Sequence, residues 1–164
     1  MPHILFVCTA NICRSPVATG VLRDRLQRKG MESWTVVSAG TWALHARPAA
    51  SNSVLVLADQ GIDISQHQAR MVGKKLLAEA DLVLCMEIGH VEALRAEFPQ
   101  AAGKIYLLSE MVGKHYSIAD PYGGSLAQYR HMADEITTII DEGFERIVEL
   151  ACRHATEDNA DSPS

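Results

Sequence analysis

The chain has 164 residues, 48% of them hydrophobic and 21% charged, and a formal net charge of −5 at pH 7. This length is enough for one domain with a full core that needs neither disulfides nor a structural metal. The acidic balance offers no basic stripe for neutralising phosphates, which argues against a general nucleic-acid-binding protein.

Strand-like and helix-like patterns alternate in the first half of the chain. The continuous apolar run over 4–7 predicts a strand that is buried on both faces. Helical spacing of apolar residues predicts a helix over about 16–29, followed by a strand over 35–38. A second helix is expected within 48–61, between a proline and a glycine.

The second half repeats this alternation. A short helix is expected over 72–80, a strand over 82–85, a helix over about 89–98 and a strand over 105–108. A loop then leads to one long amphipathic helix over about 125–152.

The order of these elements predicts the α/β class, with a four-stranded parallel sheet in three layers and helices on both faces. We expect one domain over 1–155. A frayed tail is expected over 156–164, because these residues are polar, acidic and poor in apolar side chains. In open parallel sheets the ligand site lies beyond the carboxyl ends of the strands. The loop after the first strand is therefore placed to bind a ligand.

That loop, residues 8–16, reads Cys-Thr-Ala-Asn-Ile-Cys-Arg-Ser-Pro. Unpaired N–H groups and the positive dipole end at a helix N-terminus favour an anion, both the thiolate of Cys8 and a bound oxyanion. Arg14 adds a planar fork that can hold two oxygens of a tetrahedral oxyanion. Ser15 can cap the helix or donate its hydroxyl to the sulfur. The loop predicts a phosphate cradle with Cys8 as its nucleophile.

Two plainer interpretations of the cysteines remain as alternatives. Cys8 and Cys13 would be ordinary buried thiols, or half of a zinc site. Four residues separate them and no matching pair of ligands follows, which argues against zinc and predicts no metal. The four unevenly spaced cysteines indicate a reducing cytosol, and no targeting segment is visible, so a cytoplasmic location is expected.

Cleavage of a phosphate ester also needs an acid, because a phenoxide or alkoxide leaves poorly unless it is protonated as the bond breaks. Asp120 is the candidate, since the loop over 109–124 follows the last strand and opens on the same sheet edge as Cys8. Pro121 restricts Asp120 to extended geometry. Tyr122 is interpreted as a wall that stacks on an aromatic substrate. The alternatives are an ordinary turn aspartate and an exposed turn aromatic.

These segments resemble those of the low-molecular-weight protein tyrosine phosphatase family, which has the pattern C-x5-R-S near the N-terminus and a distant D-P. The resemblance covers nearly the whole chain. It implies an enzyme that hydrolyses phosphotyrosine in proteins through a phosphocysteine intermediate, with no metal or cofactor. It also implies that Cys8 is the nucleophile, that Arg14 binds the phosphoryl oxygens and that Asp120 is the general acid and then the base.

The resemblance assigns further roles around the loop. Asn11 would hold its strained shape, Ser15 would hydrogen-bond the thiolate, and His67 and Arg70 would support the loop from behind. Cys13 matches a cysteine that can form a reversible disulfide with the nucleophile; an inert thiol is the alternative. The substrate-binding and phosphate-binding set is then Thr9, Ala10, Asn11, Ile12, Cys13, Ser15, Trp42 and Tyr122.

Protein arginine phosphatases are the closest rival, and resemble this chain over 120–125 and in the aromatic Trp42. Tyrosine-directed relatives often carry an aromatic residue where this chain has Leu44. The arginine-directed branch has threonine where this chain has Ile12. An apolar side chain at the pocket mouth would pack on a phenyl ring and offer a guanidinium nothing to bond, which favours phosphotyrosine.

Two further functions are less favoured. An arsenate reductase of this fold needs two additional cysteines close together, and Cys85 has no partner nearby in the sequence. A phosphate-binding protein without turnover would not need both a nucleophile and an acid. We expect a monomer whose partner is a phosphotyrosine-containing protein, with no nucleic acid or membrane bound.

Overall fold

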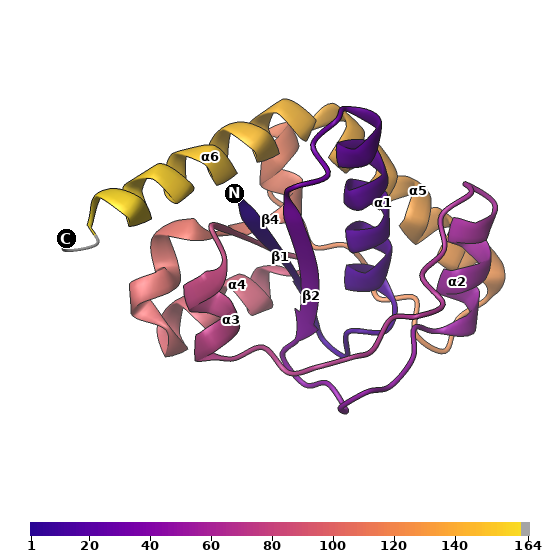
Figure 1. Ribbon diagram of the computed structural model, residues 1–164. Helices are drawn as coiled ribbons and strands as arrows, with labels where there is room; N and C mark the ends of the chain where they lie inside the picture. Colours follow the sequence, from indigo (N-terminus) through magenta and orange to yellow (C-terminus); the bar gives the residue numbers. More distant parts are fainter. Residues whose placement is uncertain (162–164) are drawn as a thin grey trace.

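The computed structural model describes residues 1–161 and has a parallel sheet with strand order β2-β1-β3-β4 (Figure 1). The strands are β1 (His3–Cys8), β2 (Thr35–Gly40), β3 (Leu82–Cys85) and β4 (Ile105–Leu107). The helices are α1 (Arg14–Arg28), α2 (Ser51–Ala58), α3 (Lys74–Glu79), α4 (Ile88–Glu97), α5 (Leu126–Glu142) and α6 (Phe144–Ala160). Two short 3₁₀ helices flank β4, η1 (Pro99–Lys104) and η2 (Leu108–Val112).

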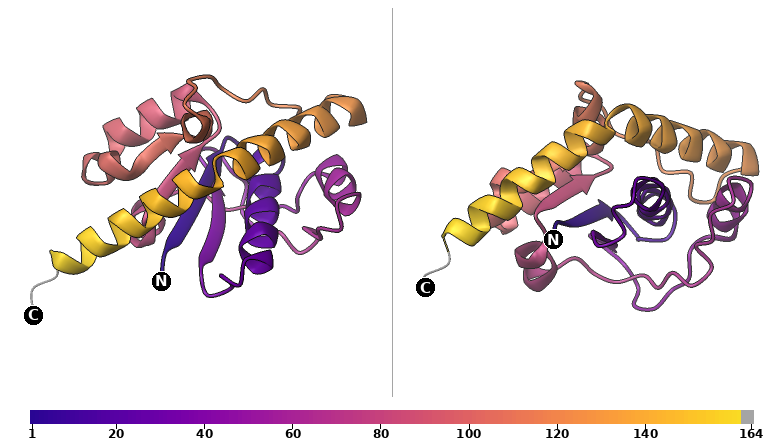
Figure 2. Two further views of the ribbon diagram at one scale, coloured as in Figure 1. Left: turned by 90° about the horizontal axis from the view of Figure 1, so that it is seen from above. Right: turned by 45° about the horizontal axis from the view of Figure 1, so that its top comes forward.

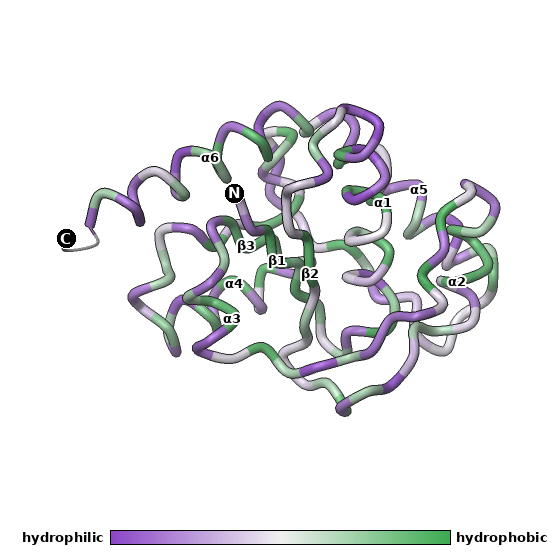
Figure 3. Tube along the Cα trace, viewed as in Figure 1, coloured by the Kyte–Doolittle hydropathy of each residue, from purple (hydrophilic) through white to green (hydrophobic). Residues whose placement is uncertain are grey.

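The two faces of β1 are buried in different clusters. Ile4 and Phe6 belong to a cluster that includes residues of α1, α2, α5 and α6. Leu5 and Val7 belong to a second cluster with residues of α3 and α4. Side chains alternate along a strand, so a continuous apolar run is needed to fill both layers. The predicted three-layer α/β fold is confirmed, and Figure 3 shows the apolar residues gathered around the strands.

The long helix predicted over 125–152 is wrong in one respect, because the chain breaks at Gly143 into α5 and α6. A Cβ at Gly143 would lie 2.8 Å from the Cβ of Met111 and 2.8 Å from the carbonyl oxygen of Ile139. Close packing against η2 therefore requires glycine here, and the apolar periodicity on both sides of it does not report that contact.

Part of the segment 156–164, predicted to be a frayed tail, is helical, since α6 continues to Ala160. Thr156 and Asn159 bond backward to the carbonyls of Cys152 and Ala155, at 3.2 and 2.9 Å. The predicted tail residues 162–164 lie outside the described residues.

The segments that carry the predicted site meet at the carboxyl ends of the strands. Gly40 ends β2 directly opposite Cys8 of β1, and a bridge joins it to Met71. A Cβ at Gly40 would lie 2.4 Å from the carbonyl oxygen of Thr9. The absence of a side chain there lets the backbone of the loop pass close to the end of β2.

Replacing Gly40 by alanine is therefore expected to push the loop away from β2. We expect the free energy of unfolding to fall by about 1–3 kcal/mol, the usual cost of inserting a methyl group into a packed site. Denaturant titration measures the loss. Gly89→Ala is the control, because a Cβ there meets nothing within 4 Å. An equal effect of both substitutions would contradict the close approach.

Candidate active site

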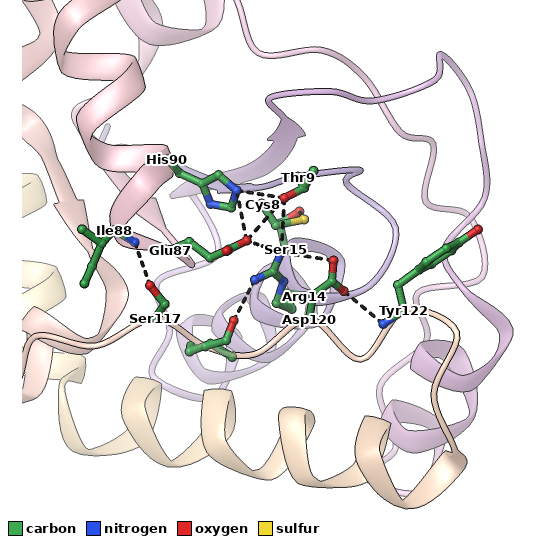
Figure 4. A network of polar contacts seen from close by, with 11 residues as sticks. Cys8, Thr9, Arg14, Ser15, Glu87, Ile88, His90, Ser117, Asp120 and Tyr122 are labelled. Atoms are coloured by element: carbon green, nitrogen blue, oxygen red, sulfur yellow. Dashed lines mark hydrogen bonds and ion pairs between the residues drawn. The ribbon is translucent and has the colours of Figure 1, made fainter.

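The sulfur of Cys8 lies at the end of β1, facing the first turn of α1. Cys8 is 2% exposed, and its Sγ lies 2.9 Å from Oγ of Ser15 (Figure 4). The Asn11 side chain donates to the same Ser15 oxygen at 2.7 Å, so that oxygen accepts one bond and its own hydrogen is available for the sulfur. This direction of bonding stabilises a thiolate at Cys8.

Asn11 fixes the shape of the loop. Its φ of 57° is left-handed, a conformation that asparagine tolerates better than most residues. Beside its bond to Ser15, Nδ2 donates to Oγ of Ser38 at 2.9 Å, and Oδ1 accepts from the amide of Arg70 at 3.1 Å. The Asn11 carbonyl accepts from Nε2 of His67 at 2.6 Å. These buried bonds hold the strained residue in place.

Arg14 is 1% exposed and is anchored at both ends of its guanidinium. One terminal nitrogen donates to the carbonyl of Ile118 at 2.7 Å, and the other to Oε2 of Glu87 at 2.8 Å. Its Nε is one of three buried side-chain polar atoms without a hydrogen-bond partner in the part of the chain described. A buried donor left unpaired is costly unless a ligand satisfies it.

Glu87 and His90 belong to the same polar network, and sequence reasoning missed both. Nε2 of His90 lies 2.9 Å from Oγ1 of Thr9, and 3.3 Å from Oε2 of Glu87 (Figure 4). Burial opposes ionisation of Glu87, but the hydrogen bond and charge of Arg14 hold the pKa of this carboxyl below its usual range. A signal was present, because Glu87 lies two residues after the end of β3, at the sheet edge where ligand sites of open parallel sheets lie.

Asp120 faces the loop from the segment before α5. Its Oδ2 lies 3.4 Å from a terminal nitrogen of Arg14, and its Oδ1 accepts from the amide of Tyr122 at 3.1 Å (Figure 4). The carboxylate side chain is 41% exposed, so it is open to a ligand entering from solvent. The ring of Tyr122 is exposed, and the guanidinium of Arg47 lies 5.8 Å from its centroid. Trp42 is 74% exposed.

The remaining residues of the loop differ in exposure. Thr9 and Ala10 are half-buried. Ile12 was expected at an open pocket mouth, but it is only 2% exposed and belongs to the larger apolar cluster. The reason is a contact distant in the sequence, since its carbonyl accepts from the amide of Ala50, which draws this part of the loop against the start of α2.

Cys13 is also buried, with Sγ 3.3 Å from the hydroxyl of Tyr129. Burial raises the pKa of the Cys13 thiol to about 11, although the bond to Tyr129 acts in the opposite direction. Cys13 is therefore a protonated thiol at neutral pH. The reversible disulfide with Cys8 stays a prediction.

His67, which bonds to the Asn11 carbonyl, is expected to make the stability of the protein depend on pH. Burial lowers the pKa of His67, and the charges of Arg23 and Arg70 act in the same direction. An unfolded histidine titrates near ~6.5, so below this pH the unfolded chain binds more protons than the folded one. The free energy of unfolding is therefore expected to fall as the pH drops from 7 towards 5.

Denaturant titration across this range measures the slope, and His67→Gln is expected to make it shallower. The exposed His131→Gln serves as the matched control and should leave the slope unchanged. If His67→Gln kept the wild-type pH dependence of the free energy of unfolding, His67 would not be its source.

Within residues 1–161, no three His, Cys, Asp or Glu side chains gather into a group that could hold a metal ion. In the same range, no helix has the length and apolar character to cross a bilayer. The site thus consists of a thiol, a buried guanidinium with a free donor, and a carboxylate facing both. A site with these three groups at the carboxyl edge of a parallel α/β sheet belongs to the class of cysteine-containing oxyanion-binding sites.

Comparisons with known proteins agree with this class. The family model for low molecular weight phosphotyrosine protein phosphatase matches residues 3–150. A protein-arginine-phosphatase of Geobacillus stearothermophilus is 38% identical, over 90% of this chain and 97% of that protein. A probable low molecular weight protein-tyrosine-phosphatase, EpsP, of Ralstonia nicotianae is 37% identical over 88% of this chain and 94% of its own length.

Solved structures agree as well. The low molecular weight protein tyrosine phosphatase from T. tengcongensis has a TM-score of 0.85 and 39% identity, covering 89% of this chain and 99% of that one. A mutant of the arginine phosphatase YwlE with a phosphorylated active-site serine has a TM-score of 0.85 and 29% identity, covering 93% and 99%. This chain belongs to the low molecular weight phosphotyrosine protein phosphatase family, as its loop predicted.

Proposed function

We propose that this protein hydrolyses phosphotyrosine in proteins through a phosphocysteine intermediate on Cys8. The observation that carries the proposal is the buried Arg14, whose unpaired Nε lies in the same loop as a thiol that accepts from Ser15. An oxyanion would satisfy that nitrogen, and the phosphorus would then lie close to the sulfur.

In the first step, the Cys8 thiolate attacks phosphorus in line with the phenolic oxygen. The phosphorus–oxygen bond breaks, and the proton of Asp120 moves to the leaving phenol. Charge on the three equatorial oxygens is held by the loop N–H groups and by Nε of Arg14. In the second step, water attacks phosphorus, its proton passes to the Asp120 carboxylate, and the phosphorus–sulfur bond breaks to restore the thiolate and release phosphate.

Two features support phosphotyrosine as the substrate. Trp42 and Tyr122 are exposed aromatic residues, suited to flank a phenyl ring above a deep phosphate cradle. Ile12 is as little exposed as Cys8, at 2%, so a substrate that reaches down into the cradle would meet its apolar side chain there. Phosphoarginine is the second candidate, because a protein-arginine-phosphatase is among the relatives and the segment 120–125 resembles that branch.

The ratio of hydrolysis rates for phosphotyrosine and phosphoarginine peptides tests the proposal. We expect a preference for phosphotyrosine with the purified full chain. A preference for phosphoarginine would mean that the proposed substrate is wrong and that the proposed mechanism on Cys8 still holds. Failure to hydrolyse either peptide or a simple aryl phosphate would overturn the proposed function.

Ile12→Thr is expected to shift this ratio towards phosphoarginine by about tenfold, since a hydroxyl can address the guanidinium and the apolar contact with the phenyl ring is weakened. Ile12→Val is the matched control, because it trims the side chain but keeps it apolar. The same ratio in wild type and Ile12→Thr would remove Ile12 as the selector.

A further inference from the structure

Two arginines lie side by side behind the phosphate-binding loop. Nε of Arg23, on α1, donates to the carbonyl of Val36 at 2.9 Å. Nε of Arg70 donates to the carbonyl of Ser38 at 3.2 Å. Both acceptors belong to β2 and are two residues apart, so one strand holds both guanidinium groups. Over residues 1–161, neither arginine forms an ion pair with a carboxylate.

Two acidic residues, Asp24 and Asp63, line the first cavity, and both carboxylates already have partners. Asp24 pairs with Arg25 at 2.6 Å and with Arg28 at 2.9 Å. Asp63 accepts from the amide of Ser65 at 2.8 Å. Burial lowers the pKa of Arg23, and the positive charge of Arg70 adds to this in the same direction because the two like charges lie near each other. An anion between the guanidinium groups would relieve this repulsion.

There is room for such an anion. The segment between α2 and α3 passes the lower ends of α1 and β2 in Figure 1. Residues of this segment line two adjoining cavities of about 340 and 420 Å³. Volumes in this range are typical of small-molecule sites. Both cavities are lined by Thr19, Arg23, Gln66 and His67. The second is also lined by polar or basic residues, namely Ser38, His45, Gln68 and Arg70.

We propose that this rear cavity, the space lined by these eight residues, binds a small phosphorylated molecule. The terminal N–H groups that do not bond to β2 would hold its phosphate group, because Nε and one terminal nitrogen of Arg23 and Nε of Arg70 are used on the strand carbonyls. The amide groups of Gln66 and Gln68 supply neutral donors beside them. The site is separate from Cys8 itself, since Pro16, at the far end of the loop, is the one residue of 8–16 that lines the first cavity and none of them lines the second.

An occupant would touch the residues that hold Asn11 in its left-handed conformation. Ser38 and His67 bond to Asn11 through their side chains, and Arg70 through its amide. A molecule that moves Arg70 or His67 therefore changes the support of the loop. This coupling to turnover rests on the proposed function, whereas the binding itself does not.

Titration of the full-length, ¹⁵N-labelled protein with inorganic phosphate, and separately with pyrophosphate, tests the site by NMR. Backbone amides of residues 9–14 report the Cys8 loop, and the side-chain Nε–H signals of Arg23 and Arg70 report the rear cavity. We expect two distinct dissociation constants. Arg23→Gln should raise the dissociation constant measured at Arg70 about tenfold, as expected for a lost charged hydrogen bond. The dissociation constant measured at residues 9–14 should stay unchanged.

Arg70→Gln, observed at Arg23, is the second variant and should give the reciprocal loss. Arg153→Gln removes an equal charge from α6 and should change neither constant. The proposal is overturned if the arginine signals do not respond, or if they follow the loop constant in wild type and in Arg23→Gln. A response of the arginines without any response of the loop would instead count against the proposed function and leave the rear site standing.

Discussion

Replacing Cys8 by serine is expected to abolish hydrolysis of phosphotyrosine peptides, with a loss of kcat of about 10⁴-fold or more, as for other essential nucleophiles. The serine hydroxyl is not ionised at neutral pH, so the bond to Ser15 and the helix dipole have no anion to stabilise. Steady-state assays with a phosphotyrosine peptide measure the loss.

The intermediate gives a sharper test of the same residue. Rapid quenching with a ³²P-labelled peptide should trap label on sulfur, through a phosphorus–sulfur bond, in wild type and in Cys13→Ser. No sulfur-bound label is expected in Cys8→Ser. Cys13→Ser is the matched control, since it changes a loop thiol that is buried against Tyr129. Equal activity of Cys8→Ser and wild type would refute the nucleophile.

Asp120→Asn is expected to lower kcat by about 10²–10⁴-fold, the range attributed to general acid–base catalysis. The size of the loss should depend on the leaving group. An aryl phosphate with an acidic phenol needs little protonation, so its hydrolysis should suffer much less than that of phosphotyrosine. This dependence separates a proton donor from a residue that only positions Arg14, which lies 3.4 Å away.

Kinetics with a series of substituted phenyl phosphates measures this dependence. Asp59→Asn is the control, because Asp59 is an exposed carboxylate that pairs with Arg130 away from the site. A uniform loss across the series in Asp120→Asn would mean that Asp120 does not protonate the leaving group.

The sequence predicts the sheet and the loop well because their determinants are local. A continuous apolar run marks β1, and the alternation with helices fixes parallel strands and so the edge where Cys8 and Asp120 meet. The break between α5 and α6 at Gly143 is not predicted, because Gly143 packs closely against Met111, which is far away in the sequence. The burial of Ile12 is missed for the same reason, since Ala50 sets it.

The polar network around Arg14 is the part least accessible from sequence. An acidic residue and a histidine at the start of a helix are common on protein surfaces, and their pattern does not say what they face. Only the folded chain brings Glu87 within 2.8 Å of Arg14 and His90 within 2.9 Å of Thr9. The guanidinium is thus already placed before any ligand arrives.

Both ends of the described chain lie on the amino side of the sheet. The carbonyl of Pro2 accepts from the amide of Thr35 where β2 begins, and Asp158 near the end of α6 lies 4.0 Å from Lys104 just before β4. Figure 2 shows α6 running out to that side. A fusion partner or a linker to a solid surface attached at either end would therefore leave the Cys8 edge of the sheet open. The protein could then be immobilised and still meet a large protein substrate at that edge.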